Sequence, residues 1–74
     1  MSIYPSLTGK QILKALKKAG FDIKRIKGSH YFMEHPDGRV TVVPVHGKEI
    51  IGPGLMNKIL HDCELSRDKF LKLL

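Results

Sequence analysis

Residues 30–45 read HYFMEHPDGRVTVVPV and predict a β-hairpin. Residues 30–35 form the first expected strand, and residues 39–45 form a second strand rich in valine. Between them, Pro36-Asp37-Gly38 is a strong tight-turn sequence, because proline presets φ and glycine tolerates positive φ. Pro44 has no amide hydrogen to donate, so strand pairing ends there or this strand lies at a sheet edge.

Upstream of the hairpin, the sequence predicts an amphipathic helix that begins at a capping box, Thr8-Gly9-Lys10-Gln11. Leu7 and Ile12 have the spacing of a hydrophobic staple around that cap. Gly20 follows two lysines and an alanine, which is typical of a helix C-terminus. The apolar stripe of this helix consists of Ile12, Leu13, Leu16 and Ala19.

A short strand is expected between this helix and the hairpin. Phe21, Ile23 and Ile26 are its apolar residues, but the alternation is lost near Lys24-Arg25. Gly28-Ser29 then separates this strand from the hairpin.

A second helix is expected to begin at Gly52-Pro53-Gly54-Leu55, with Pro53 at its first helical position. Its buried face is predicted to hold Cys63, as a small core residue rather than a nucleophile. Ser66 can cap a last short helix. The other apolar residues of these two helices are Leu55, Met56, Ile59, Leu60, Phe70, Leu71 and Leu74.

Together these elements predict an α+β fold with the order α-β-β-β-α and a short C-terminal helical tail. Two amphipathic helices are available to cover one face of a three-stranded antiparallel sheet. The 74 residues contain no internal repeat or linker, so we expect one domain over residues 1–74.

The charge is unevenly distributed along the chain. Thirteen Lys and Arg against seven Asp and Glu give a net charge of +6. Residues 1–39 hold eight basic and three acidic residues, a net +5, whereas residues 40–74 hold five and four, a net +1. A basic surface of this kind favours a polyanionic partner such as RNA, although it also serves solubility alone.

The remaining bulk features favour a cytoplasmic protein. No apolar run approaches the length of about 20 residues that spans a membrane. Residues 1–5, Met-Ser-Ile-Tyr-Pro, lack the basic and then apolar pattern of a secretory signal. The single cysteine cannot form an internal disulfide.

The polar side of the first predicted helix is a candidate nucleic-acid surface. Four lysines share this side without an acidic residue among them: Lys10, Lys14, Lys17 and Lys18. They can contact phosphates or an acidic partner protein, and the alternative is an ordinary solvated helix face.

His30 is the candidate for acid–base chemistry. Histidine as a residue type has an unperturbed pKa near 6.5, which suits proton transfer at neutral pH, and His30 directly follows Gly28-Ser29 at the start of a strand. RNA cleavage without a metal needs a base for the ribose 2′-hydroxyl and cations for the developing charge, which Lys27 and Arg25 can supply. The alternative is a histidine that merely begins a strand.

Other types of site are not indicated. The four histidines and one cysteine lack zinc-ligand spacing, and no Walker loop, nucleophile elbow or dinucleotide fingerprint occurs. His35, beside the hairpin turn, and His61, on the polar side of the second helix, are expected at the surface. We therefore expect no metal and no cofactor.

The succession of motifs resembles the HicA family of mRNA interferase toxins, also described as YcfA-like. The resemblance covers nearly the whole chain in order. Its motifs are Gly20-Phe21, Lys27-Gly28-Ser29-His30, Pro36-Asp37-Gly38-Arg39, Val43-Pro44-Val45-His46, Gly52-Pro53-Gly54-Leu55 and Lys58-Ile59-Leu60. Asn57 departs from the family pattern, in which relatives often carry a basic residue.

The resemblance implies a double-stranded-RNA-binding-like fold with both helices on one face of the sheet. It also implies the toxin of a type II toxin–antitoxin pair that cleaves mRNA independently of the ribosome and is neutralised by a HicB-like antitoxin. The family's essential histidine falls at His30, and His46 matches a recurrent position with a possible supporting role. The proton donor for the leaving 5′-oxygen stays open among His46, Lys27, Ser29, Tyr31 and water.

Two other functions are compatible with the same residues. One is a non-catalytic RNA-binding module that uses the basic helix face and gives salt-sensitive binding. The other is a degraded toxin relative that acts only as an interaction partner.

Overall fold

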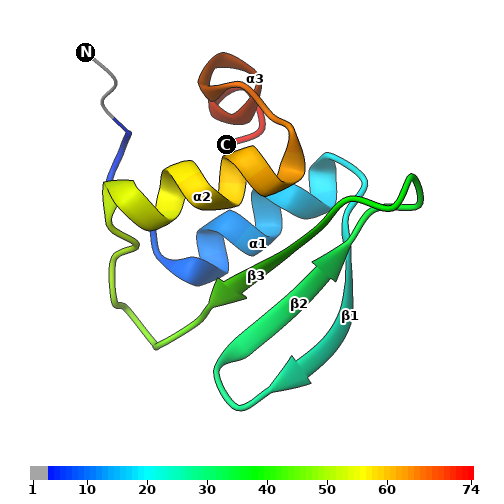
Figure 1. The fold of residues 1–74 in the computed structure, drawn as a ribbon. Helices are drawn as coiled ribbons and strands as arrows, with labels where there is room; N and C mark the ends of the chain where they lie inside the picture. Colours follow the sequence, from blue (N-terminus) through cyan, green and yellow to red (C-terminus); the bar gives the residue numbers. More distant parts are fainter. Residues whose placement is uncertain (1–3) are drawn as a thin grey trace.

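The computed structural model describes residues 4–74 (Figure 1). The first three residues of the N-terminal stretch considered for a signal sequence lie outside this range. The elements, in chain order, are α1 (Gly9–Lys18), β1 (Asp22–Lys27), β2 (His30–Glu34), β3 (Val40–Pro44), α2 (Pro53–Cys63) and α3 (Arg67–Leu71). The expected order of helix, three strands, helix and helical tail is confirmed.

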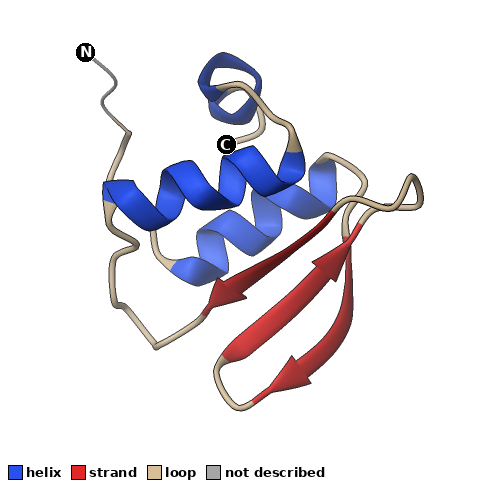
Figure 2. Ribbon diagram, viewed as in Figure 1, coloured by secondary structure: helices blue, strands red, loops and turns tan. Residues whose placement is uncertain are grey.

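The three strands form one antiparallel sheet in the order β1-β2-β3. Helices α1 and α2 lie on the same side of this sheet, and α3 lies beyond α2 (Figure 2). The α+β prediction is therefore confirmed, and the arrangement is consistent with a double-stranded-RNA-binding-like fold. The sheet face opposite the helices, here named the open face, is left uncovered by any helix of residues 4–74.

A β-bulge explains why the alternation of the first strand breaks in the sequence. Ile23 pairs with Met33, whereas Arg25 pairs with Phe32, so Lys24 is an extra residue in β1. The bulge reverses the side-chain alternation of β1 at this point, and it lets Arg25 share the open face with Phe32.

The hairpin strands are slightly shorter than predicted. His35 and Arg39 belong to the turn, which is closed by a hydrogen bond of 2.9 Å from His35 N to Arg39 O. Gly38 adopts a φ of +99°, as the turn sequence requires. Pro44 is the last residue of β3, and β3 is an edge strand. Strand pairing therefore ends at this proline and its strand lies at a sheet edge, the two alternatives that the sequence offered.

His35, expected at the surface, is instead half-buried. Its ring packs edge-on against Phe21 with centroids 5.2 Å apart. A Cβ atom added to Gly20 would lie 2.8 Å from His35 Nε2, so Gly20, which follows the C-cap of α1, is constrained both by its φ of +99° and by this ring. His35 therefore has a structural role.

The helix caps form as the sequence predicts. The Thr8 and Gln11 side chains each accept from the other residue's backbone amide, and Gly52 and Pro53 occupy the N-cap and first position of α2. Ser66 accepts from Lys69 N and caps α3.

The core consists of Leu7, Ile12, Leu13, Ala15, Leu16, Phe21, Met33, Val43, Met56, Ile59, Leu60, Cys63 and Phe70. Leu74, expected to be an apolar contact of the tail, is 49% exposed.

Arg39 ties the hairpin to α2. Its guanidinium binds the Asp37 carboxylate at 2.8 Å, donates to the carbonyl of Cys63 and lies over the Phe21 ring. The hydrogen bonds from Arg39 lower the pKa of Asp37. Arg39 is thus occupied by structural contacts.

The Cys63 thiol should be inert in the folded protein. The side chain is fully buried, and burial raises the pKa of the thiol to about 12. Since the thiolate is the reacting species, we expect alkylation by iodoacetamide at pH 8 to be roughly a thousandfold slower than in the urea-unfolded chain. Mass spectrometry of timed samples measures this, and equal rates in the two states would contradict the assignment of Cys63 to the core.

Candidate active site

His30 is the first residue of β2 and lies on the open face. It pairs with Lys27 of β1 and with Pro44 of β3, and its side chain is exposed. Tyr31 packs against the core and Met33 is buried within it, so these two residues face the helices. Because side chains alternate along a strand, His30, Phe32 and Glu34 point to the opposite face.

The Gly28-Ser29 turn links a second histidine, His46, to the residue that precedes His30. Gly28 adopts a φ of +60° in the tight connection between β1 and β2. Beyond the last pair of β2 and β3, Val45 N donates to Ser29 O at 2.7 Å, and a hydrogen bond of 3.1 Å joins Ser29 Oγ to His46 Nε2. The residue that precedes His30 is therefore bonded to His46 through its side chain.

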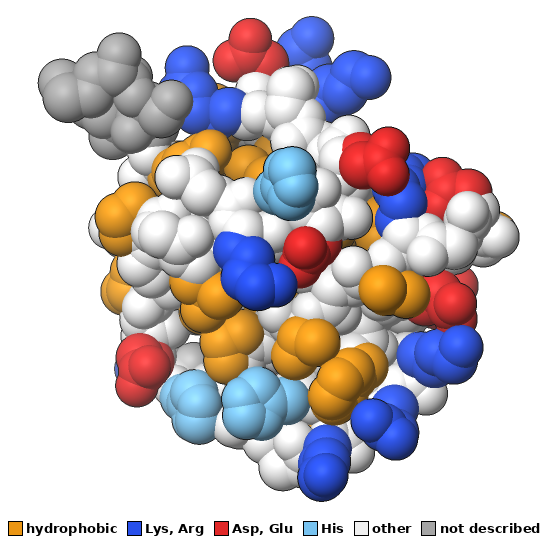
Figure 3. Space-filling view, in the orientation of Figure 1, with side chains coloured by type: hydrophobic (Ala, Val, Ile, Leu, Met, Phe, Trp, Pro, Cys, Tyr) orange, Lys and Arg blue, Asp and Glu red, His pale blue; other side chains and the backbone are white. Residues whose placement is uncertain are grey.

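Figure 3 shows this end of the sheet from outside. Histidine side chains lie next to one another where β2 begins and β3 ends, with hydrophobic and then Lys and Arg side chains beside them. Two exposed imidazoles at one sheet end can exchange protons with a bound substrate. Cations nearby can offset negative charge that develops on it.

The four candidate lysines of α1 lie on the helix side of the sheet, and three of them share one groove. Lys10, Lys14 and Lys17 line a groove of about 830 Å³ between α1 and the sheet, here named the lysine groove. Lys48 lies on the same groove. Its remaining lining residues are Thr8, Leu13, Ile23, Tyr31, Val45 and Gly47.

The lysine groove and His30 therefore do not share one pocket. Tyr31 lines the groove, and its neighbour His30 points to the opposite face by strand alternation. A polyanion that contacts both has to pass around the rim of the sheet, for example at the end where Gly47 and Lys48 line the groove.

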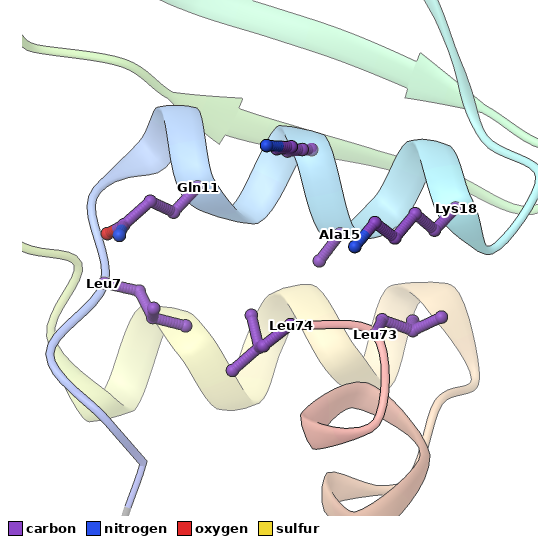
Figure 4. Close-up of a pocket in the computed structure, with 7 residues that line it drawn as sticks. Leu7, Gln11, Ala15, Lys18, Leu73 and Leu74 are labelled. Carbon is purple, nitrogen blue, oxygen red and sulfur yellow. The ribbon is translucent and has the colours of Figure 1, made fainter.

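Lys18 lines a different hollow from Lys10 and Lys17. Together with Lys14 it borders a hollow of about 230 Å³ between α1 and the C-terminal residues Leu73 and Leu74 (Figure 4). The four lysines, which the sequence groups on one side of the helix, therefore line two different hollows in the fold.

Arg25 and Lys27 lie nearer to His30. Lys27 is the direct cross-strand neighbour of His30, and Arg25 pairs with Phe32, two residues further along β2. The guanidinium carbon of Arg25 lies 4.7 Å from the centre of the Phe32 ring. Sequence reasoning missed Phe32, although its spacing of two residues from His30 on a strand is a signal that the two side chains share a face.

Asn57 has a contact of its own. Its Oδ1 accepts a hydrogen bond of 2.8 Å from the Tyr4 hydroxyl, so this departure from the family pattern links α2 to the segment before α1.

Across residues 4–74, no group of three or more His, Cys, Asp and Glu side chains is arranged to hold a metal ion. No helix in that range is long and apolar enough to cross a membrane.

A comparison with protein-family models matches residues 9–65 to the family described as HicA toxin of bacterial toxin-antitoxin. The chain belongs to the HicA toxin family. The HicA match runs from the start of α1 to just after α2, so it includes the sheet and the segment that carries Ser29, His30 and His46. A search of curated proteins finds no match to this HicA family member. The chain is thus related to toxins of bacterial toxin–antitoxin systems.

Proposed function

We propose that this HicA family member is an endoribonuclease that cleaves mRNA without a metal ion, with His30 as general acid/base. The observation that carries the proposal is the exposed His30 at the sheet end, directly after the residue whose hydroxyl is bonded to His46. An imidazole in this position is held by strand pairing, and it remains open to a substrate.

In the proposed reaction, His30 accepts the proton of a ribose 2′-hydroxyl while the 2′-oxygen attacks the adjacent phosphorus. Protonated His46 gives a proton to the 5′-oxygen as the phosphorus–oxygen bond breaks. The products are a 2′,3′-cyclic phosphate and a 5′-hydroxyl, and proton exchange with water restores both imidazoles. Ser29 orients His46, and Lys27, the cross-strand neighbour of His30, stabilises the charge on the phosphoryl oxygens together with Arg25.

The lysine groove supplies the RNA contacts that do not take part in chemistry. Lys10, Lys14 and Lys17 would bind backbone phosphates of the strand that continues past the sheet end, and Lys18 would extend this surface along α1. Their contribution to binding should weaken with salt, because each neutralised phosphate releases counterions.

The proposal includes a partner and a location. A HicB-like antitoxin would silence the toxin by covering His30 and the lysine groove, since mRNA needs both. A toxin that cleaves mRNA would act in the cytoplasm, where mRNA is translated. A complex in which His30 stays exposed to solvent would contradict this mode of inhibition.

The test is incubation of the purified protein with a long single-stranded RNA in EDTA. We expect fragments that end in a 2′,3′-cyclic phosphate and begin with a 5′-hydroxyl, because the reaction needs only the chain's own side chains. End-group analysis by mass spectrometry identifies them. Cleavage that requires added Mg²⁺, or fragments with a 3′-hydroxyl, would contradict the mechanism.

The separation of the lysine groove from His30 favours one alternative, a non-catalytic RNA-binding module. In that case the same incubation yields intact RNA, and binding falls steeply with salt. The His30→Ala variant would then bind RNA as the unaltered protein does.

A further inference from the structure

The open face carries an aromatic and cationic pair directly beside His30. Phe32 follows His30 on the same face of β2, so the two residues are separated by about 7 Å along the strand. Strand pairing places Arg25 on one side of Phe32 and Val42 on the other. These three residues form the row next to Lys27, His30 and Pro44.

The surroundings of Phe32 leave room for a flat ligand. The ring is half-buried, and Arg25 covers one side of it at 4.7 Å. A hollow of about 450 Å³ lies along Phe32 and the neighbouring strand β3. Its lining residues are Lys24, Phe32, Met33, Val40, Thr41, Val42 and Asp62.

Near His30 the charged residues of the open face are cations, whereas the acidic Asp22 and Glu34 are strand partners at the other end of β1 and β2. Glu34 is the acidic residue of β2 on the open face, and it is paired with Lys24 at 2.8 Å. Arg25 and Lys27 remain as cations on the side of β1. An aromatic face next to a planar guanidinium is a surface on which nucleobases stack, whatever their sequence.

We propose that Phe32 and Arg25 form a stacking subsite for the RNA base adjacent to the cleaved phosphate. The inference rests on the proposed function, because an RNA strand whose phosphate is held at His30 brings a neighbouring base within reach of the next row of the sheet. The subsite orients the scissile phosphate toward His30 and contributes to the choice of cleavage position. It is a binding subsite, and neither residue takes part in proton transfer.

Binding to a short fluorescent oligoadenylate, measured by anisotropy, tests this subsite. All variants carry His30→Ala, so that no cleavage disturbs the titration. We expect Phe32→Leu to weaken binding by roughly tenfold, because loss of base–aromatic stacking is worth about 1–3 kcal/mol and leucine keeps the apolar bulk. Phe32→Tyr keeps the ring and should bind within about twofold of the parent.

Two further variants sharpen the comparison. Ile50→Thr is the matched control, because Ile50 is a β-branched residue that is 50% exposed but lies in the segment before α2, outside the three strands and the hollow beside Phe32. It should leave the affinity within about twofold, as expected for a surface change outside the subsite. Arg25→Lys keeps the charge but removes the planar group, and it should weaken binding several-fold. It tests the subsite without altering the ring, should Phe32→Leu fail to fold.

The outcomes separate the subsite from the proposed function. If the unaltered protein cleaves RNA but Phe32→Leu and Arg25→Lys bind as tightly as their parent, the subsite is wrong and the nuclease proposal stands. If Phe32→Leu weakens binding but the unaltered protein cleaves no RNA, the subsite is supported and the nuclease proposal is wrong. If Phe32→Leu weakens binding of the antitoxin and leaves RNA affinity unchanged, this part of the open face is a protein interface and the subsite is wrong.

Discussion

Replacing His30 with alanine is expected to lower the rate of RNA cleavage by at least a hundredfold. Proton transfer by a positioned side chain contributes about 10²–10⁴-fold to a rate, and alanine removes the proposed acceptor altogether. In cells, induction of the unaltered chain should arrest growth, and induction of His30→Ala should not. Single-turnover cleavage of a defined RNA, together with growth curves after induction, measures both effects.

The fold should survive this substitution. His30 is exposed, and it pairs with its neighbours through backbone atoms, so the loss of its side chain empties no space in the core. Circular dichroism and thermal melting should match those of the unaltered protein. RNA binding should persist as well, since the lysine groove lies on the other side of the sheet.

His61→Ala is the matched control for the loss of a histidine. His61 is exposed on α2, away from the Ser29 and His46 pair. Its replacement should leave cleavage and growth arrest unchanged. Full cleavage activity in both variants would remove His30 from the mechanism. An equal loss of activity in both would point to damage that is not specific to the site.

Replacing Gly9 with alanine should destabilise the protein strongly. Gly9 is the buried first residue of α1, and a Cβ atom there would lie 2.1 Å from the carbonyl oxygen of Pro44 and 3.1 Å from Val45 Cα. These are backbone atoms at the end of β3, so no flexible side chain can move aside. Helix α1 and the strand end must separate instead, and overpacking of this kind costs about 1–3 kcal/mol.

A loss of this size is large for a small domain, whose total stability is about 0.05–0.15 kcal/mol per residue. We expect the melting temperature of Gly9→Ala to fall by about 10 °C or more, measured by circular dichroism. Cleavage should also fall at temperatures where the variant is folded. The displaced backbone at Pro44 leads directly into His46, so the hydrogen bond with Ser29 would be disturbed.

Gly54→Ala provides the control for adding a methyl group to a helix start. Gly54 lies in the first turn of α2, and apart from its chain neighbours and its own helix backbone no atom comes within 4 Å of a Cβ placed there. Alanine has the higher helix propensity, so this variant should melt at or slightly above the temperature of the unaltered protein. A similar melting temperature for Gly9→Ala and Gly54→Ala would show that α1 and β3 are not held in the close contact described.

Local signals in the sequence were sufficient for the secondary structure. The capping box at Thr8 and Gln11, Pro53 at a helix start and the turn at residues 36–38 each depend on side chains within a few positions of one another. The burial of Cys63 likewise follows from helical periodicity. His35 was misjudged because its partner, Phe21, belongs to a different segment.

The candidate site required more than these local patterns. The sequence by itself determined the order of the elements, the hairpin and the choice of His30, because these depend on short-range spacing and on motifs shared with the HicA family. The tertiary structure decided which side chains share a surface. Strand register joins Ser29 to His46 and sets Phe32 beside Arg25 across a bulge, while strand alternation turns His30 away from the lysines of α1. The physical reason is that a sheet brings together residues that are distant in the chain, and a shift of one residue in register moves a side chain to the opposite face.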